Sequence, residues 1–155
     1  MNLLKRILLV EDDPMDAEMT LKALAAHHLA NEVLHLRDGA EALDFFYRRG
    51  AFKDRPNGNP AVVLLDLKMP KVDGLGVLRQ IKDDPDLKTI PVVVMTSSRE
   101  DRDLQAAYQL GVNAYVVKPV KFPEFVDAVK QVGVFWAVLN EPPPGSVSRG
   151  DWPRE

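Results

Sequence analysis

The sequence predicts a doubly wound α/β fold, in which a five-stranded parallel sheet is flanked by five helices. Four short segments are continuously apolar and rich in β-branched residues, and such runs are typical of strands covered on both faces. Segments with apolar residues at helical spacing lie between them, so strand and helix alternate five times along the chain. This alternation favours parallel strands joined by right-handed crossovers.

The expected strands are short, and the second differs from the others because its apolar and polar residues alternate. Strands are predicted at residues 7–10, 32–36, 61–65, 92–95 and 115–117. Helices are predicted where apolar residues recur three and four positions apart, at 17–25, 40–46, 77–81, 104–110 and 122–136. A long polar loop at 48–60 separates the second helix from the third strand.

The length of 155 residues suits one domain, which we expect to occupy residues 1–140. Residues 141–155 include three consecutive prolines and two glycines. A segment of this composition is expected to be irregular or disordered.

The composition argues against several classes of protein. The absence of cysteine removes disulfide scaffolds, thiolate zinc sites and cysteine nucleophiles. A formal net charge of −3 gives no electrostatic basis for direct nucleic-acid binding. No apolar run approaches the roughly 18 residues of a membrane span, and the first residues do not form a signal peptide. We therefore expect a cytoplasmic protein that acts without membrane or nucleic acid.

Polar residues follow four of the five expected strands, and they suggest where the chemistry lies. Ligands of an open parallel sheet bind beyond the carboxyl ends of its strands. The residues at those ends are acidic, hydroxylic or basic: Glu11, Asp12 and Asp13 after the first strand, Asp66 after the third, Thr96, Ser97 and Ser98 after the fourth, and Lys118 after the fifth. Several carboxylates, a hydroxyl and a lysine are thus expected at one edge.

Such a set of groups restricts the chemistry. Crowded carboxylates repel, and a bound hard cation relieves that repulsion. Mg²⁺ takes few protein carboxylates and completes its octahedron with water and phosphate oxygens. A carboxylate beside it can attack a phosphoryl group in line, while the lysine and threonine donate hydrogen bonds to the phosphoryl oxygens. The set therefore predicts Mg²⁺-dependent phosphoryl acceptance.

Each residue also has a simpler interpretation when taken alone. Asp13 precedes Pro14, as is usual at a helix start, so only Glu11 and Asp12 are assigned to the metal. Asp66 could cap a loop, because Asp73 and Gly74 form a turn just beyond it. A lone threonine or lysine carries no functional information. The prediction depends on the combination.

The combination resembles a response-regulator receiver domain, which implies a flavodoxin-like fold. The motifs that carry the resemblance are Val-Glu-Asp-Asp at 10–13, Leu-Leu-Asp-Leu-Lys-Met-Pro at 64–70 with Asp-Gly at 73–74, Met-Thr-Ser at 95–97 and Lys-Pro at 118–119. Residues 5 to 135 are covered. A receiver accepts a phosphoryl group from a sensor histidine kinase and switches a protein–protein interface; beyond self-phosphorylation and self-dephosphorylation it is not an enzyme.

The resemblance implies a role for each marker position. Asp66 corresponds to the phosphoacceptor, and Glu11, Asp12, Asp66 and the backbone carbonyl of Lys68 to the magnesium ligands. Thr96 corresponds to the switch hydroxyl, Lys118 to the lysine that binds the phosphoryl group and Tyr115 to the aromatic switch. The side chains of Lys68 and Ser98 occupy positions that modulate dephosphorylation.

A narrower resemblance concerns the partner. The 48–60 loop, Ala-Leu-Asp-Phe-Phe at 42–46, Asp-Pro-Asp-Leu at 84–87 with Ile-Pro at 90–91, and Phe-Trp at 135–136 are similar to single-domain receivers paired with bacterial phytochrome kinases. None of these positions is catalytic, so the pairing rests on the pattern. The downstream protein is not identifiable from the sequence.

Two other functions fit these residues less well. A haloacid-dehalogenase-type phosphatase needs a second carboxylate two residues after its nucleophile, and that position is Lys68. A receiver-like binding module without phosphorylation is disfavoured by the complete set of acidic, hydroxyl and lysine residues.

The end of the fifth helix predicts a homodimer formed by this helix with the fourth helix and fifth strand. A helix docked on a sheet needs one apolar stripe, but residues 132–139 are apolar on all sides, so Phe135, Trp136 or Leu139 would face water. Exposed apolar patches mark interaction surfaces, and two-fold contacts commonly bury them. The alternative is that this end folds back over its own domain, with residues 142–144 as a clasp.

Overall fold

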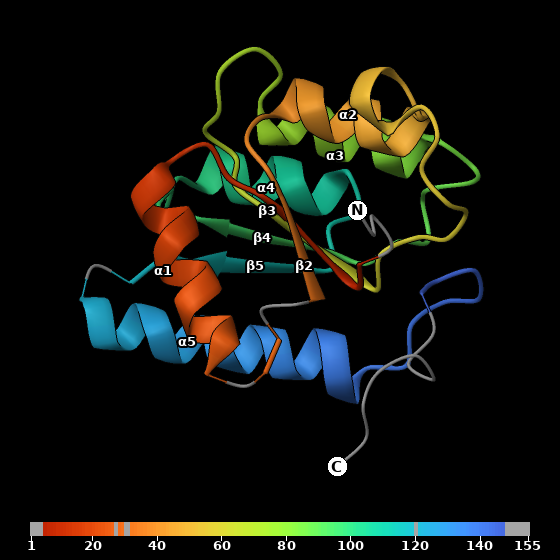
Figure 1. Ribbon diagram of the computed structural model, residues 1–155. Coiled ribbons are helices and arrows are strands. Elements are labelled where there is room, and N and C mark those ends of the chain that lie inside the picture. The colour runs from red at the N-terminus through yellow and green to blue at the C-terminus, as the bar shows by residue number, and fades with distance from the viewer. Residues whose placement is uncertain (1–4, 27, 30–31, 120, 148–155) are drawn as a thin grey trace.

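A five-stranded parallel sheet in the order β2-β1-β3-β4-β5 forms the centre of the molecule (Figure 1). The structure is a computed structural model that describes residues 5–26, 28–29, 32–119 and 121–147. The strands are β1 (Ile7–Val10), β2 (Val33–Leu36), β3 (Val62–Leu65), β4 (Val92–Thr96) and β5 (Ala114–Val117). The helices are α1 (Pro14–Ala25), α2 (Gly39–Tyr47), α3 (Gly74–Asp83), α4 (Asp101–Gln109) and α5 (Phe122–Val134). The predicted fold class is confirmed.

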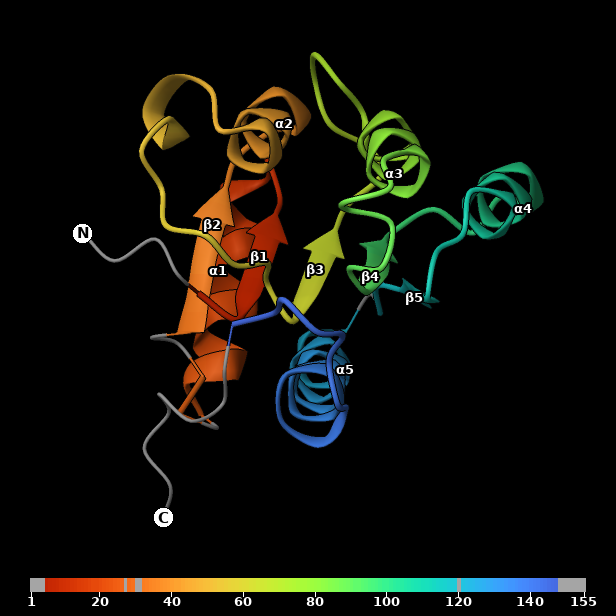
Figure 2. The same ribbon diagram turned by 90° about the vertical axis from the view of Figure 1, so that its right-hand side faces the viewer.

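The helices form one layer on each side of the sheet, with α1 and α5 below it and α2, α3 and α4 above it (Figures 1 and 2). Alternate residues of the central strands therefore enter different cores. Leu8 and Val10 pack in the core between the sheet and helices α2, α3 and α4. Ile7 and Leu9 pack in the core between the sheet and helices α1 and α5. Burial on both faces explains why these strands have no polar alternation.

The predicted elements differ from the observed ones mainly at their ends. β2 begins one residue later than expected and β4 ends one residue later, at Thr96. In α4 the expected apolar stripe is only partly buried, because Leu104 and Tyr108 are 39% and 54% exposed while Ala107 is fully buried. The predicted fifth helix ends as an α-helix at Val134 and continues as a π-helical turn, Phe135–Leu139.

The segment 141–147 folds back over the amino ends of the strands. The amide of Asn59 donates to the carbonyl of Gly145 at 2.9 Å, and the amide of Val147 donates to the carbonyl of Asn59 at 2.8 Å. The buried guanidinium of Arg6 donates to the carbonyls of Val147, at 3.0 Å, and Ala137. This part of the predicted tail is irregular but packed against the domain. Its remainder, 148–155, lies outside the described residues.

The long loop after α2 is also tied to the domain. It contains a short 3-10 helix, Gly50–Phe52, whose Phe52 ring packs edge-on against Phe45 at 5.5 Å. Arg55 is buried and donates from Nε to the carbonyl of Phe45 at 2.7 Å. These contacts hold the loop along α2 and beside the folded-back segment.

One glycine allows α3 to begin close to the carboxyl end of β3. A Cβ atom added to Gly74 would lie 2.2 Å from the carbonyl oxygen of Asp66 and 2.6 Å from the Cα atom of Leu67. Both of these are backbone atoms that cannot move independently of the strand end. Glycine at this position therefore lets the helix and Asp66 approach each other.

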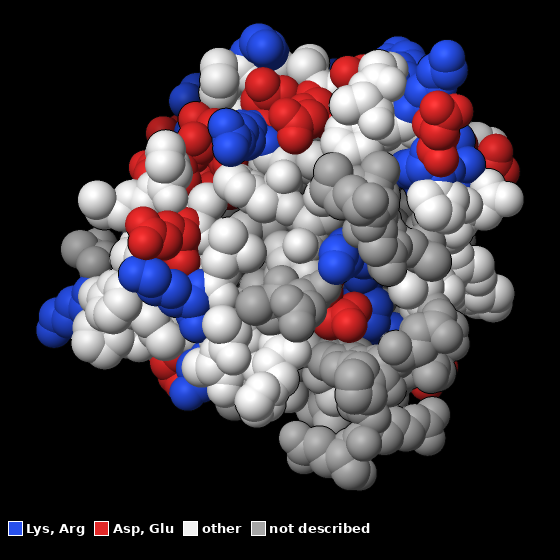
Figure 3. Space-filling view, viewed as in Figure 1, with Lys and Arg blue, Asp and Glu red and all other residues white. Residues whose placement is uncertain are grey.

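No helix among the described residues is long and apolar enough to cross a membrane. On the face shown in Figure 3, acidic and basic side chains are interspersed instead of gathering by sign.

Candidate functional site

Three carboxylates meet where β1 and β3 end. One oxygen from each of Glu11, Asp12 and Asp66 lies within 4.8 Å of the others. The two strands pair directly, and the amide of Asp66 donates to the carbonyl of Val10 at 3.1 Å. Glu11 is 3% exposed and Asp66 is 9% exposed, so solvent screens their mutual repulsion only in part.

Asp13 lies beside this cluster but serves the helix. Its Oδ1 accepts hydrogen bonds from the amides of Met15, at 2.8 Å, and Asp16, at 3.2 Å. It is thus the N-cap of α1, with Pro14 in the first turn. The expectation that Asp13 caps the helix is confirmed.

Lys118 joins the carboxylates from the end of β5. Its Nζ lies 2.5 Å from Glu11 Oε1, 2.8 Å from Asp16 Oδ2 and 3.6 Å from Asp66 Oδ2, and its side chain is 9% exposed. The ammonium is therefore shared by three carboxylates, and its hydrogen bonds go to Glu11 and Asp16.

Asp16 is a contributor that the sequence analysis missed. It lies in the first turn of α1, three residues after the cap, whereas the prediction considered only residues directly following strands. A helix that starts at the site returns to the same side after one turn. That spacing was the available signal.

Burial and charge shift two pKa values in the cluster. Burial raises the pKa of Glu11 from 4.5 to about 8; the hydrogen bond from Lys118 opposes the shift and the charge of Asp66 adds to it. Burial lowers the pKa of Lys118, but hydrogen bonds to Asp16 and Glu11 and the charge of Asp66 outweigh it, so the pKa is raised. Lys118 thus stays charged, while Glu11 readily holds a proton when no cation is bound.

The donor set fits a hard divalent cation. All three clustered ligand groups are carboxylates, and oxygen donors are those that Mg²⁺ and Mn²⁺ prefer. Burial and the charge of Asp66 raise the pKa of Glu11, so its ionised form would be stabilised by a nearby positive charge, which a divalent cation supplies.

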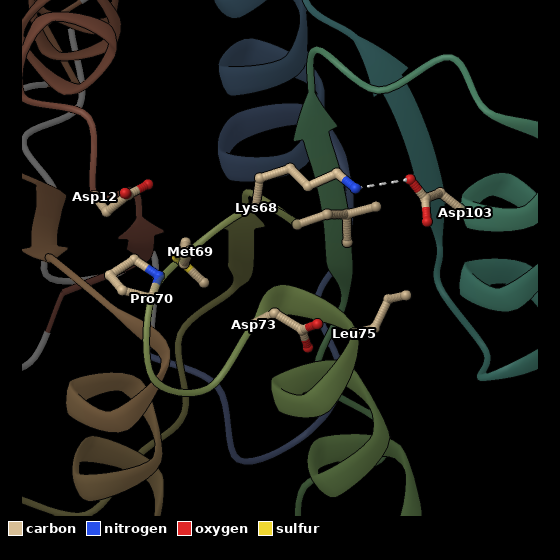
Figure 4. Close-up of a pocket in the computed structure, with 8 residues that line it drawn as sticks. Asp12, Lys68, Met69, Pro70, Asp73, Leu75 and Asp103 are labelled. Carbon is tan, nitrogen blue, oxygen red and sulfur yellow. Dashed lines mark ion pairs between the residues drawn. The ribbon is translucent and has the colours of Figure 1, made fainter.

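Asp12, one of the three clustered carboxylates, lines an open pocket with a volume of about 410 Å³ (Figure 4). Its lining residues come from the ends of β1 and β3 and the starts of α3 and α4: Asp12, Leu67, Lys68, Met69, Pro70, Asp73, Leu75 and Asp103. Of these, Asp12 belongs to the acidic cluster, and Lys68 pairs with Asp103. The pocket therefore adjoins the acidic cluster.

The predicted switch residues are linked by hydrogen bonds. Thr96 is fully buried, and its Oγ1 accepts from the amide of Ser98 at 3.3 Å. The hydroxyl of Tyr115 donates to the carbonyl of Ser98 at 3.1 Å. Thr96 and Tyr115 are therefore connected through one residue of the β4–α4 loop.

Lys68 lines the pocket together with Asp103. Its amide is 3.4 Å from Asp66 Oδ1, while its ammonium extends to Asp103 Oδ2 at 3.4 Å (Figure 4). Asp103 was not among the predicted site residues, because it lies inside α4 and not at a strand end.

The three residues predicted for a dimer interface lie apart from this pocket, on the π-helical turn after α5. Phe135 and Leu139 are 49% and 68% exposed. Trp136 is partly buried and packs edge-on against Phe135 at 5.1 Å. The folding back of 141–147 leaves both exposed side chains uncovered.

Comparison with known proteins identifies the family. Residues 7–130 match the response regulator receiver domain, and the chain belongs to this family of signalling receivers, which are not classical enzymes. Within it, the chain is 40% identical to the response regulator Rcp1 of Synechocystis sp. over 132 residues, 85% of this chain and 88% of that protein.

Solved structures give the same relationship. The Mn²⁺-bound form of Rcp1 is 39% identical with a TM-score of 0.83 and covers 90% of this chain and 99% of its own. The bacteriophytochrome response regulator RtBRR is 60% identical with a TM-score of 0.72 and covers 93% of this chain and 87% of its own. The predicted similarity to phytochrome response regulators is confirmed.

Proposed function

We propose that this protein accepts a phosphoryl group from a sensor histidine kinase on Asp66, in a Mg²⁺-dependent reaction, and thereby switches a protein–protein interface. The observation that carries the proposal is that Asp66 lies beside both a cluster of carboxylates and a lysine. One oxygen from each of Glu11, Asp12 and Asp66 lies within 4.8 Å of the others, and the ammonium of Lys118 lies 3.6 Å from Asp66 Oδ2.

The proposed roles follow from this arrangement. Glu11, Asp12, Asp66 and the backbone carbonyl of Lys68 would hold Mg²⁺, which neutralises charge on the carboxylates and phosphoryl oxygens. A carboxylate oxygen of Asp66 forms a bond to phosphorus as the bond from phosphorus to the donor breaks. Lys118 donates hydrogen bonds to the phosphoryl oxygens, which compensates the charge that the group brings.

The proposed switch uses Thr96 and Tyr115. Thr96 Oγ1 accepts from the amide of Ser98, so its own proton is available for a phosphoryl oxygen. A shift of Thr96 toward that oxygen would act on Tyr115 through Ser98. Lys68 and Ser98 are proposed to modulate dephosphorylation, and the contact of both side chains with Asp103 supports a common role.

The proposed kinase is of the phytochrome type and meets the protein in the cytoplasm. Support comes from similarity to the bacteriophytochrome response regulator RtBRR and the phosphorylated cyanobacterial phytochrome response regulator RcpA. The output would pass to a downstream protein. We also propose a homodimer through α5, α4 and β5, supported by the exposed Phe135 and Leu139.

Incubation with acetyl phosphate tests the central proposal. With Mg²⁺ present, intact-mass spectrometry should show the addition of one phosphoryl group, because Asp66 lies beside both the proposed cation ligands and Lys118. Chelation by EDTA should prevent the addition. Hydroxylamine should release the group, as expected for an acyl phosphate. An unmodified mass under these conditions would refute the proposal.

Mg²⁺ affinity should depend on pH through Glu11. The pKa of this carboxyl is raised to about 8, so a cation that binds near neutral pH must displace its proton. The association constant should therefore rise by up to about tenfold per pH unit below that pKa and level off above it. Calorimetric titration in buffers of different ionisation enthalpy would count the released proton.

Two variants separate the metal ligand from its neighbour. Glu11→Gln should weaken Mg²⁺ binding and remove the proton release. Asp13→Asn should change neither, because Asn caps helices as well as Asp does. An affinity that stays constant between about pH 6 and pH 8 in the wild-type protein would contradict the linkage.

A further inference from the structure

We propose that Asp103 is a positioning residue for the phosphorylation of Asp66: it holds Lys68 and Ser98 in the unphosphorylated arrangement and so weakens binding of a phosphoryl group. The inference rests on the proposed function. Asp103 neither touches Asp66 nor belongs to the predicted metal ligands, and it would act only through its two partners.

The side chain of Asp103 is buried and contacts both Ser98 and Lys68. It lies in the first turn of α4 and is 7% exposed. Its Oδ2 accepts a hydrogen bond from Ser98 Oγ at 2.5 Å and pairs with Lys68 Nζ at 3.4 Å. Charged side chains are rarely buried to this degree unless they are paired.

The ionisation of Asp103 agrees with this geometry. The hydrogen bond from Ser98 lowers its pKa, the charge of Lys68 contributes in the same direction, and burial opposes them. The side chain is therefore a carboxylate at neutral pH and attracts both partners.

Asp103 joins segments that are distant in sequence but meet at the pocket mouth. Lys68 comes from the loop after β3 and the carboxylate itself from α4 (Figure 4), while Ser98 comes from the loop after β4. Through Ser98 the link continues to the buried Thr96 hydroxyl and the Tyr115 hydroxyl. Lys68 and Ser98 thus share one carboxylate, and the backbone of Ser98 connects it to the two switch residues.

A phosphoryl group would compete with Asp103 for Lys68. The amide of Lys68 is 3.4 Å from Asp66 Oδ1, so its side chain starts beside the phosphorylation site and leads away from it. A phosphoryl group carries about two negative charges and would draw the ammonium back. The side chain of Lys68 is 58% exposed, so it can move from Asp103 to a phosphoryl group.

The competition for Lys68 lowers the affinity for a phosphoryl group. A contact that must be given up when the phosphoryl group binds stabilises the empty state and lowers the apparent affinity. Removing the carboxylate charge therefore frees Lys68 and loosens Ser98, and both effects favour the occupied state. A purely structural Asp103 would change stability and leave the affinity unchanged.

Beryllofluoride, a phosphoryl mimic, provides the test in the presence of Mg²⁺. Its dissociation constant, measured by fluorine NMR, should fall by roughly three- to tenfold in Asp103→Asn, the range expected for a partly exposed ion pair and a charged hydrogen bond. Asp101→Asn is the matched control, because the same substitution falls on an exposed residue of the same helical turn. Its affinity should equal that of the wild type.

Coupling to Lys68 distinguishes the mechanism from a general loosening of α4. In a Lys68→Met background the gain from Asp103→Asn should shrink, because one partner of the contact is already absent. If Asp103→Asn does not fold, as judged by circular dichroism, Ser98→Ala removes the hydrogen bond to the same carboxylate and should also tighten binding.

The outcomes separate this inference from the proposed function. A wild-type protein that binds no beryllofluoride would overturn both. A wild-type protein that binds it, with an equal or weaker affinity in Asp103→Asn, would overturn only the role of Asp103. A gain of equal size in the Lys68→Met background would overturn the competition for Lys68.

Discussion

Asp66→Asn should abolish phosphorylation by acetyl phosphate. The amide that replaces the carboxylate is a poor nucleophile, and the change also removes the negative charge of one of the three clustered carboxylates that would hold Mg²⁺. Glu11 cannot take over, because it is 3% exposed and hydrogen-bonded to Lys118 at 2.5 Å. Intact-mass spectrometry after incubation with the donor should show only the unmodified chain.

Asp73→Asn is a suitable control for that experiment. Asp73 lines the same pocket, but its side chain caps α3 through the amide of Gly76 at 2.9 Å. Asn preserves such a cap, so this variant should be phosphorylated like the wild type. A phosphoryl group that persists in Asp66→Asn and maps to Asp12 would show that the nucleophile had been assigned to the wrong strand.

Charged substitutions at Phe135 and Leu139 should convert a dimer into a folded monomer. The two side chains are 49% and 68% exposed in one copy, and an apolar patch of this kind is costly in water unless a partner covers it. Folding back of 141–147 was the alternative, and it occurs without covering them. The same patch on a second copy is a self-complementary partner.

Sedimentation velocity at micromolar concentration would measure this effect. The wild type should sediment as a dimer and Phe135→Glu/Leu139→Glu as a monomer with an unchanged circular dichroism spectrum. Met15→Glu is the matched control, because Met15 is 69% exposed on α1, outside the proposed interface. A monomeric wild type, both with and without phosphorylation, would refute the dimer.

The fold was predictable because burial on both faces leaves a direct trace in the sequence. The continuous apolar runs of β1, β3 and β4 mark strands between two helical layers. The π-helical turn after Val134 was not predictable, because an apolar run without a proline or glycine within it carries no signal for where the helical geometry changes.

The site was predictable to the extent that it lies at strand ends. Parallel strands bring their carboxyl ends to one edge, and this alone places Glu11, Asp12, Asp66 and Lys118 near one another. Asp16 and Asp103 were missed because each reaches the site from within a helix. Helical spacing after Asp13 was an available signal for Asp16, but spacing does not encode the side-chain rotamers that bring Asp16 to Lys118 and Asp103 to Lys68.

The burial of Arg6 has a consequence for the order in which the protein can mature. Two carbonyls that accept hydrogen bonds from its guanidinium belong to Ala137 and Val147, so a residue next to β1 can form these bonds only after the segment that follows α5 has been synthesised. The ribosome releases amino-terminal segments first, and β1 therefore leaves it before these hydrogen bonds can form. While the domain is still being translated, the side chain of Arg6 would be exposed at the amino ends of the strands. The nascent chain would therefore differ from the finished protein at this place.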